Sequence, residues 1–220
     1  MNQRYNIHYY PSEDKMKSAR KYYIKYFCPN GEILDLGCGR GEFLELLRET
    51  NRHGQGIETD AGIVNICRQK GLEVIHSDAT VFLKSEKDKK WDGIFMGHII
   101  EHLDWKGATE LLTLASNRLK RTGRLVVLTP NPHFLPSVGH FWSDMTHRRP
   151  YTIDGLKSFL SFTGLRIIEA GVDPATKLRV SWRHPREAII NLARLIILRL
   201  VMLEYYDGGE IYVVGEKECE

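Results

Sequence analysis

The sequence predicts an α/β fold in which a mostly parallel sheet is flanked by helices. Three observations predict this class. Short apolar runs alternate with helical patterns from residue 31 to residue 172, a glycine-rich turn follows the first apolar run, and the composition is that of a globular domain. Hydrophobic residues make up 42% and charged residues 27% of the 220 residues, so residues 1–220 are expected to form one domain with a full core.

The chain is expected to begin with a helical cap over residues 1–30. A helix is expected over residues 12–27, because Ser12 is a favoured N-cap residue and two acidic residues follow it in the first turn. The turn Pro29-Asn30-Gly31 separates this helix from the first strand.

Four strand–helix pairs are expected next. Each strand is a short apolar run, and the first helix has a buried face formed by Phe43, Leu44, Leu46 and Leu47. In chain order the strand and helix pairs are 32–37 and 42–50, 54–60 and 61–71, 72–78 and 79–86, and 91–97 and 108–120.

The last part of the chain completes the sheet. The helix expected over 152–164 has Thr152 as its N-cap and Gly164 at its end. The remaining strands are expected over 123–131, 165–172 and 209–217.

An apolar helix is expected over residues 186–203, between the last two strands. Asn191, Arg194 and Arg199 interrupt its apolar run, so it is not expected to cross a membrane. Its apolar residues form two faces, whereas packing on a core needs only one. We expect the second face to meet a second copy of the chain or, as a second choice, a membrane surface. The two faces are Ile189, Leu192, Ile196, Leu200 and Leu203, and Ile190, Ile197 and Val201.

The turn Gly37-Cys38-Gly39-Arg40-Gly41 marks a ligand site after the first strand. A P-loop would place Lys-Ser or Lys-Thr after it, which this chain lacks. A dinucleotide-binding turn has the spacing G-x-G-x-x-G, and this turn is one residue shorter. Glu42 would also repel a pyrophosphate at the start of the next helix. Both phosphate-binding interpretations are therefore disfavoured.

Acidic residues at three successive strand ends instead favour a cationic ligand. Asp35, Glu58 and Asp78 are all expected at the edge of the sheet where parallel strands end. S-adenosylmethionine carries a sulfonium and an ammonium and no phosphate. Glu58 would accept from its ribose hydroxyls, Asp78 from its adenine amino group, and the N–H of Ala79 would face a ring nitrogen.

Five segments resemble the successive motifs of class I S-adenosylmethionine-dependent methyltransferases: "ILDLGCGRGEFLELL", "GIETD", "HSDA", "WDGIFMGHIIEHL" and "RLKRTGRLVVLTPNP". The resemblance implies a Rossmann-like, seven-stranded sheet whose last strand is antiparallel, and a methyltransferase activity. It implies a cofactor-binding half over 31–130. Its cofactor-binding residues would be Asp35, Gly37, Cys38, Gly39, Gly41, Glu58, Thr59, Asp78, Ala79, Gly97 and His98. In this family the N-terminal helix often covers the cofactor. Tyr5, Tyr9 and Tyr10 would close the pocket or, as we favour, pack.

The segment His98-Ile-Ile-Glu101-His102 also matches H-x-x-E-H, an inverted zinc-protease signature. Two histidines four residues apart on a helix can bind zinc, with the glutamate as a base, and a zinc hydrolase is the alternative enzyme. We expect no metal here, because the motif directly follows a buried strand. Gly97 and His98 are expected in the cofactor wall, and Glu101 and His102 are expected to orient the loop.

The molecule that accepts the methyl group, here called the acceptor, is expected to contact the loop at residues 139–152, "GHFWSDMTHRRPYT". His147 and Asp144 are the candidate catalytic residues, one as a base and the other as an orienting partner. An arginine would bind an anionic group through two hydrogen bonds. A loop that only packs is the alternative. The candidate substrate-binding residues are His140, Trp142, Arg148, Arg149 and Tyr151.

This loop resembles D-P-T-H-x-R-P-[YF], found in a subset of class I methyltransferases, several of them tied to cell-surface polysaccharide synthesis. Met145 stands in place of the proline, so Asp144 is expected to sit somewhat differently than in that subset. Ubiquinone-synthesis enzymes have a comparable Thr-His. The resemblance thus implies a small-molecule or glycan acceptor, methylated at oxygen. A binder of S-adenosylmethionine without activity is a further alternative.

Charge and cysteines limit the partners and the setting. The net charge of +3 is too small to imply nucleic-acid binding. The four cysteines form no C-x-x-C pair, which disfavours a zinc site on cysteines and a disulfide framework. The chain is expected in the cytoplasm, with membrane contact only through the helix at 186–203. Within the single domain, residues 131–220 are expected to hold the acceptor loop, the C-terminal strands and this inserted helix.

Overall fold

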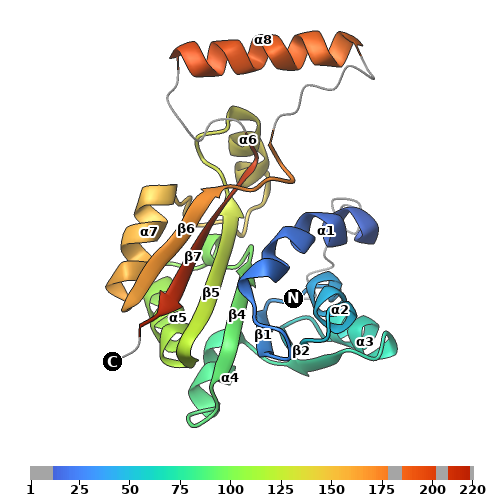
Figure 1. The fold of residues 1–220 in the computed structure, drawn as a ribbon, viewed down its shortest axis with the longest axis vertical. Coiled ribbons are helices and arrows are strands. Elements are labelled where there is room, and N and C mark those ends of the chain that lie inside the picture. Colours follow the sequence, from blue (N-terminus) through green and yellow to red (C-terminus); the bar gives the residue numbers. More distant parts are fainter. Residues whose placement is uncertain (1–11, 178–184, 202–207, 219–220) are drawn as a thin grey trace.

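A twisted sheet of seven strands in the order β3-β2-β1-β4-β5-β7-β6 forms the centre of the protein (Figure 1). The computed structural model describes residues 12–177, 185–201 and 208–218. The strands are β1 (Glu32–Leu36), β2 (His53–Glu58), β3 (Glu73–His76), β4 (Trp91–Gly97), β5 (Leu119–Pro130), β6 (Leu165–Val172) and β7 (Glu210–Lys217).

The direction of the strands confirms the predicted α/β class. β1 pairs in parallel with β2 and β4, β2 with β3, and β4 with β5. β7 lies antiparallel between β5 and β6, with Val213 opposite Val127 and Ala170. The carboxyl ends of the five parallel strands therefore meet at one edge, which is where ligands bind in such sheets.

Helices cover both faces of the sheet (Figure 1). On one face α4, α5 and α7 pack against side chains such as Leu34, Ile94 and Val127, and on the other the N-terminal helices, α2 and α3 pack against side chains such as Ile33 and Val126. The helices are α1 (Glu13–Arg20), η2 (Lys21–Tyr26), α2 (Glu42–Glu49), α3 (Ala61–Gln69), α4 (Ala79–Ser85), η3 (Ile100–His102), α5 (Trp105–Asn117), α6 (Leu135–Ser143), α7 (Ile153–Phe162) and α8 (Pro185–Val201).

Four predicted elements need correction. The helix expected over 12–27 is α-helical only to Arg20 and continues as the 3₁₀ helix η2, and Ser12 accepts no capping hydrogen bond through its side chain. α5 starts three residues early because Asp104 caps it, accepting from the N–H of Gly107 at 2.7 Å. β5 begins at Leu119, and α6 lies where only a loop was expected.

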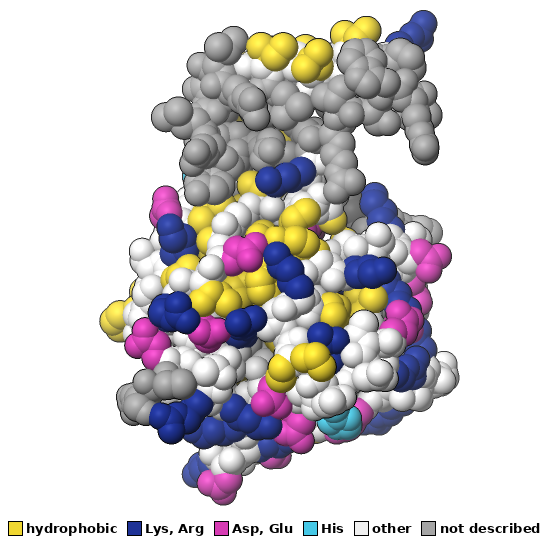
Figure 2. Space-filling view, viewed as in Figure 1, with side chains coloured by type: hydrophobic (Ala, Val, Ile, Leu, Met, Phe, Trp, Pro, Cys, Tyr) yellow, Lys and Arg dark blue, Asp and Glu magenta, His cyan; other side chains and the backbone are white. Residues whose placement is uncertain are grey.

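The apolar helix α8 differs from the prediction in its packing. It lies apart from the sheet, beyond α6 (Figure 1), and hydrophobic side chains are visible on it in Figure 2. The described members of both predicted faces are exposed, and of the α8 side chains that the structure describes only Ala188 is buried. Within the described parts of the chain, no helix has both the length and the apolar character needed to cross a bilayer. The exposed members of the two faces are Ile189, Ile190, Leu192, Ile196 and Ile197.

Several residues of the predictions fall outside this description. Tyr5, Tyr9, Tyr10 and Leu203 lie outside the described residues, and the side chains of His140, Leu200 and Val201 are likewise not described.

Candidate functional site

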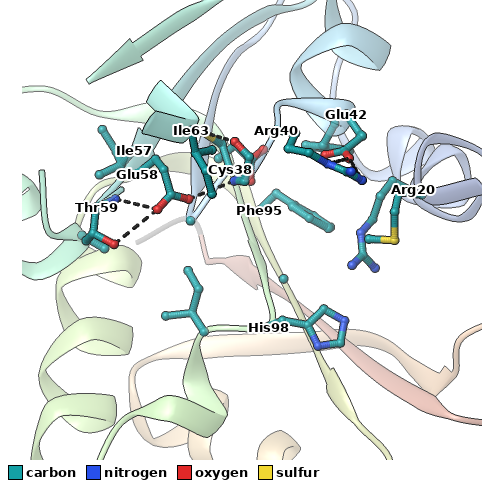
Figure 3. Close-up of a pocket in the computed structure, with 18 of the residues that line it drawn as sticks. Arg20, Cys38, Arg40, Glu42, Ile57, Glu58, Thr59, Ile63, Phe95 and His98 are labelled. Carbon is teal, nitrogen blue, oxygen red and sulfur yellow. Dashed lines mark hydrogen bonds and ion pairs between the residues drawn. The ribbon is translucent and has the colours of Figure 1, made fainter. Parts of the chain in front are cut away.

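A cavity of about 280 Å³ opens at the carboxyl ends of β1, β2, β3 and β4 (Figure 3). It brings together ten of the eleven residues predicted to bind the cofactor. These ten are Asp35, Gly37, Cys38, Gly39, Glu58, Thr59, Asp78, Ala79, Gly97 and His98. Gly41 is the exception. It precedes α2 with φ of 83°, and a Cβ there would lie 2.4 Å from Leu72 Cδ1, so its role is in packing.

The glycine turn leaves open space at one position. Gly37 and Gly39 have φ of 64° and 52°, in the left-handed region that favours glycine. A Cβ at Gly37 would lie 2.7 Å from Ile99 Cδ1, whereas a Cβ at Gly39 would meet nothing within 4 Å. Gly39 therefore presents bare backbone to the cavity, as a turn must when a ligand approaches it closely.

Glu58 ties the turn to the end of β2. Its Oε1 accepts from the N–H of Thr59 at 2.7 Å (Figure 3). The same oxygen accepts from the N–H of Asp60 at 3.0 Å, and Oε2 accepts from the N–H of Gly39 at 3.1 Å. These backbone donors fix a carboxylate in the cavity wall. A fixed carboxylate is suited to accept from paired hydroxyls of a ligand.

The two other acids differ in their surroundings. Asp78 caps α4, because its Oδ1 accepts from the N–H groups of Thr80 at 2.8 Å and Val81 at 3.0 Å, and its Oδ2 is the oxygen left for a ligand. Asp35 is only 2% exposed. Burial raises the pKa of Asp35 well above its usual range, and the guanidinium of Arg20 opposes this rise. A cationic ligand would therefore favour the ionised form of Asp35.

Two features of the cavity have no signal in the sequence. Arg20 comes from the end of α1, lies 5.8 Å from the ring of Phe95 and donates from Nη1 to Glu210 Oε2 at 3.4 Å. Phe95 stacks on Phe43 with ring centroids 4.1 Å apart, so the cavity has an aromatic wall. No local pattern marks Arg20, because its position depends on how α1 crosses the edge of the sheet.

The H-x-x-E-H segment is not one helix, which corrects the basis of the zinc-hydrolase alternative. His98 has a left-handed φ of 57°, and only Ile100–His102 form a 3₁₀ turn. His98 lies between two carboxylates, with Nδ1 3.0 Å from Glu101 Oε1 and Nε2 3.2 Å from Glu210 Oε1. Burial alone would lower the pKa of His98, but Glu210 and Glu101 raise it to about 9. A protonated imidazole has no lone pair for zinc.

The acceptor loop reaches the cavity through His102. His102 lines the cavity, and its Nδ1 lies 2.8 Å from Thr146 Oγ1. The ring centroids of His147 and His102 lie 4.5 Å apart. Nε2 of His147 lies 3.8 Å from Asp144 Oδ2. Burial would raise the pKa of Asp144, but the hydroxyl and N–H of Thr146 hold it below its usual range. Asp144 and His147 thus stand beside the cavity, one residue removed from its wall.

The other predicted acceptor residues are placed differently. Tyr151 is buried in the core and packs near Phe159. Cζ of Arg149 lies over two rings, 5.1 Å from the centroid of the Trp105 ring and 5.6 Å from that of the Tyr151 ring. Trp142 and Arg148 are exposed, and His140 lies on α6. Of these residues, none of the four whose side chains the structure describes lines the cavity.

Comparisons with known proteins give a consistent set of matches. The family model described as methionine biosynthesis protein MetW matches residues 19–141, more than half of the chain. No curated protein matches the chain. A crystal structure of an S-adenosylmethionine-dependent methyltransferase from Archaeoglobus fulgidus is 31% identical, with a TM-score of 0.77 over 94% of this chain and 95% of that chain.

Two more distant structures share the fold. An S-adenosylmethionine-dependent methyltransferase from Thermotoga maritima is 19% identical, with a TM-score of 0.67 over 94% of this chain and 91% of that chain. The Burkholderia thailandensis 1,6-didemethyltoxoflavin-N1-methyltransferase, with 1,6-didemethyltoxoflavin and S-adenosylhomocysteine bound, is 13% identical, with a TM-score of 0.62 over 94% of this chain and 80% of that chain.

Proposed function

The chain belongs to the family described as methionine biosynthesis protein MetW and is an S-adenosylmethionine-dependent methyltransferase, and from this premise we propose that it methylates an oxygen of a small-molecule or glycan acceptor. The observation that carries the proposal is the position of Asp144 and His147, which reach the cavity through His102. Cell-surface polysaccharide synthesis is the proposed setting.

The residues of the cavity fit S-adenosylmethionine. The open space beside Gly39 leaves room for a closely approaching ligand, and Asp35 and Arg20 supply opposite charges for an ammonium and a carboxylate. We assign the ribose hydroxyls to Glu58 and the adenine to Asp78 and its neighbour in the chain. When bound, the cofactor supplies a methyl group on a positively charged sulfur.

The acceptor would be held by the loop beside the cavity. His147 orients the acceptor oxygen through Nε2, because its Nδ1 is occupied by the carbonyl of Phe141 at 2.7 Å. Asp144 takes the proton of the acceptor, since its carboxylate is ionised and lies 3.8 Å from His147 Nε2. The exposed side chains of Trp142 and Arg148 would contact outer parts of the acceptor.

The test is transfer of a labelled methyl group to a panel of hydroxyl, carboxyl, amine and thiol acceptors. We expect label on oxygen and a loss of turnover in His147→Ala, with the affinity for S-adenosylmethionine unchanged. Label on nitrogen or sulfur alone would contradict the proposal. Normal affinity with no turnover on any acceptor would favour the non-catalytic binder.

We propose that α8 meets a second copy of this chain, with a membrane surface as the alternative. Isoleucines from both predicted faces of α8 are 50–61% exposed, and two such helices would bury them against each other. Light scattering of the wild type and of Ile189→Glu tests the dimer, and sedimentation with anionic vesicles tests the alternative. A monomeric wild type that does not bind vesicles would contradict both.

A further inference from the structure

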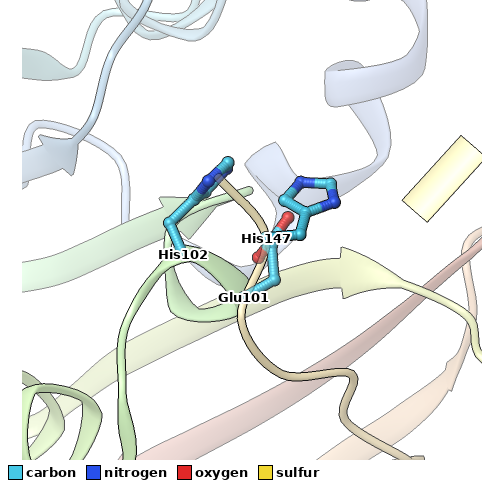
Figure 4. A group of neighbouring side chains, drawn as sticks. All are labelled: Glu101, His102 and His147. Atoms are coloured by element: carbon cyan, nitrogen blue, oxygen red, sulfur yellow. The ribbon is translucent and has the colours of Figure 1, made fainter. Parts of the chain in front are cut away.

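Three side chains that can bind a metal converge beside the cavity. Glu101, His102 and His147 each offer one ligand atom, and these atoms lie within 4.8 Å of one another. Figure 4 shows the three side chains pointing toward one another from η3 and from the segment after α6. The carboxylate of Glu101 is fully buried, and the two imidazoles are partly buried.

Hydrogen bonds select the same tautomer in both histidines. His147 Nδ1 lies 2.7 Å from the carbonyl oxygen of Phe141, so it must donate its proton there. The hydroxyl of Thr146 donates its only proton to Asp144 Oδ1 at 2.6 Å, so it can only accept from His102 Nδ1 at 2.8 Å. Both imidazoles therefore carry the proton on Nδ1 and keep a free lone pair on Nε2, as metal-binding histidines do.

The carboxylate of Glu101 is held from both sides. Its Oε1 accepts from His98 Nδ1 at 3.0 Å, and its Oε2 accepts from Thr129 Oγ1 at 3.0 Å. Each oxygen keeps a second lone pair for an ion. His98 itself is excluded as a ligand, since both of its nitrogens face carboxylates, those of Glu101 and Glu210.

We propose that Glu101, His102 and His147 form a site for a divalent transition metal ion, with Zn²⁺ as the best match. Two histidines, one carboxylate and an open position are the ligand set of catalytic zinc sites. Tetrahedral ligands at about 2.0–2.1 Å from zinc lie roughly 3.4 Å apart, so the three side chains close slightly around the ion. This triad differs from the H-x-x-E-H pattern in the sequence, because His147 takes the place of His98.

The role of the ion in the reaction rests on the proposed function, and with the ion bound His147 Nε2 would orient the acceptor oxygen through the ion instead of contacting it directly. His102 lines the cavity, so the open position would bind the acceptor oxygen and lower the pKa of its hydroxyl. The hydroxyl gives its proton to Asp144, and its oxygen takes the methyl group. The electron pair of the broken carbon–sulfur bond stays on sulfur.

Metal binding is tested on the full chain without acceptor or cofactor. After treatment with a chelator, the protein is titrated with Zn²⁺ against a coloured competitor, and with Co²⁺ while visible absorption is recorded. We expect one equivalent of tight binding. We expect the affinity for Zn²⁺ to be more than about 100-fold weaker in His102→Ala and His147→Ala. Loss of a residue that only hydrogen-bonds to a metal ligand already weakens metal binding about 10- to 100-fold. The matched control is His53→Ala, at the amino end of β2, whose side chain is exposed.

Two further measurements keep the test decisive. Glu101→Gln preserves the size of the buried side chain, and the melting temperature of each variant reports whether it is folded. X-ray absorption of the zinc form should show nitrogen and oxygen neighbours and no sulfur. Equal zinc affinity in the wild type and in folded His102→Ala and His147→Ala would overturn the site, and so would sulfur ligands.

The metal site and the proposed function can fail separately. If zinc binds as expected but the metal-free enzyme methylates oxygen at the normal rate, the role of the ion in the reaction is overturned. If zinc does not bind at this triad while label still reaches oxygen, the site is overturned and the proposed function stands.

Discussion

Replacing Gly39 with alanine separates cofactor binding from folding. Gly39 has a left-handed φ of 52°, and a Cβ there would meet nothing within 4 Å. The free energy of unfolding of the variant should therefore fall only by the cost of holding a residue with a side chain in a left-handed conformation, about 1–2 kcal/mol. For a chain of this size each kcal/mol corresponds to about 2–4 °C in the melting temperature. The new methyl group projects into the cavity that would hold S-adenosylmethionine.

Gly164→Ala is the matched control. Gly164 follows α7 with a left-handed φ of 80°, and a Cβ there also meets nothing within 4 Å, but this glycine does not line the cavity. We expect similar losses of melting temperature in the two variants. In calorimetric titration the affinity for S-adenosylmethionine should fall at least about tenfold, or about 1.4 kcal/mol, in Gly39→Ala alone. Wild-type affinity in a folded Gly39→Ala would refute the placement of the ligand.

Three further predictions concern Glu58, His98 and Thr152. Glu58→Ala should weaken S-adenosylmethionine binding at least about tenfold in calorimetry, because this carboxylate lines the cavity and holds the N–H of Gly39; unchanged affinity would count against its assignment. Burial lowers the pKa of His98 but the carboxylates of Glu210 and Glu101 raise it from 6.5 to about 9. Urea titrations should therefore show the free energy of unfolding falling by up to about 3 kcal/mol as the pH rises from about 6.5 to about 9, and His98→Gln should lack this slope. Thr152→Ala removes the cap that accepts from the N–H of Gly155 at 3.1 Å and should cost about 1 kcal/mol in thermal unfolding, without affecting cofactor affinity.

The fold could be predicted where local pattern and burial agree. The bounds of β6 coincide with the predicted 165–172, and the face of α2 that holds Phe43 and Leu47 is buried as predicted. The early part of β5 was missed because Lys120, Arg121 and Thr122 carry no apolar pattern. α6 was missed because proline and glycine within it favour a loop.

The packing of α8 could not be predicted from its composition. Apolar residues on two faces predicted one core contact, yet Ile189 and Ile197, one from each predicted face, are both exposed. The hydrophobicity of a helix face predicts that the face will be buried. It does not predict which surface buries it, because that depends on the path of the chain.

The cofactor half of the site was predictable and the acceptor half was less so. Glycine spacing and strand-end acids are local signals, and they placed Gly39, Glu58 and Asp78 in one cavity. Contacts between distant segments leave no such signal. The pairing of His98 with Glu210 and the approach of His147 to His102 join residues far apart in the chain, and only the tertiary structure brings them together.

The acid-lined cavity at the ends of the parallel strands is where we place S-adenosylmethionine. A crystal structure with S-adenosylhomocysteine tests this placement most directly. We predict the ribose hydroxyls within hydrogen-bonding distance of Glu58, the adenine beside Asp78, and the amino-acid part against Gly39. A ligand bound outside this cavity, or one whose ribose is far from Glu58, would contradict it.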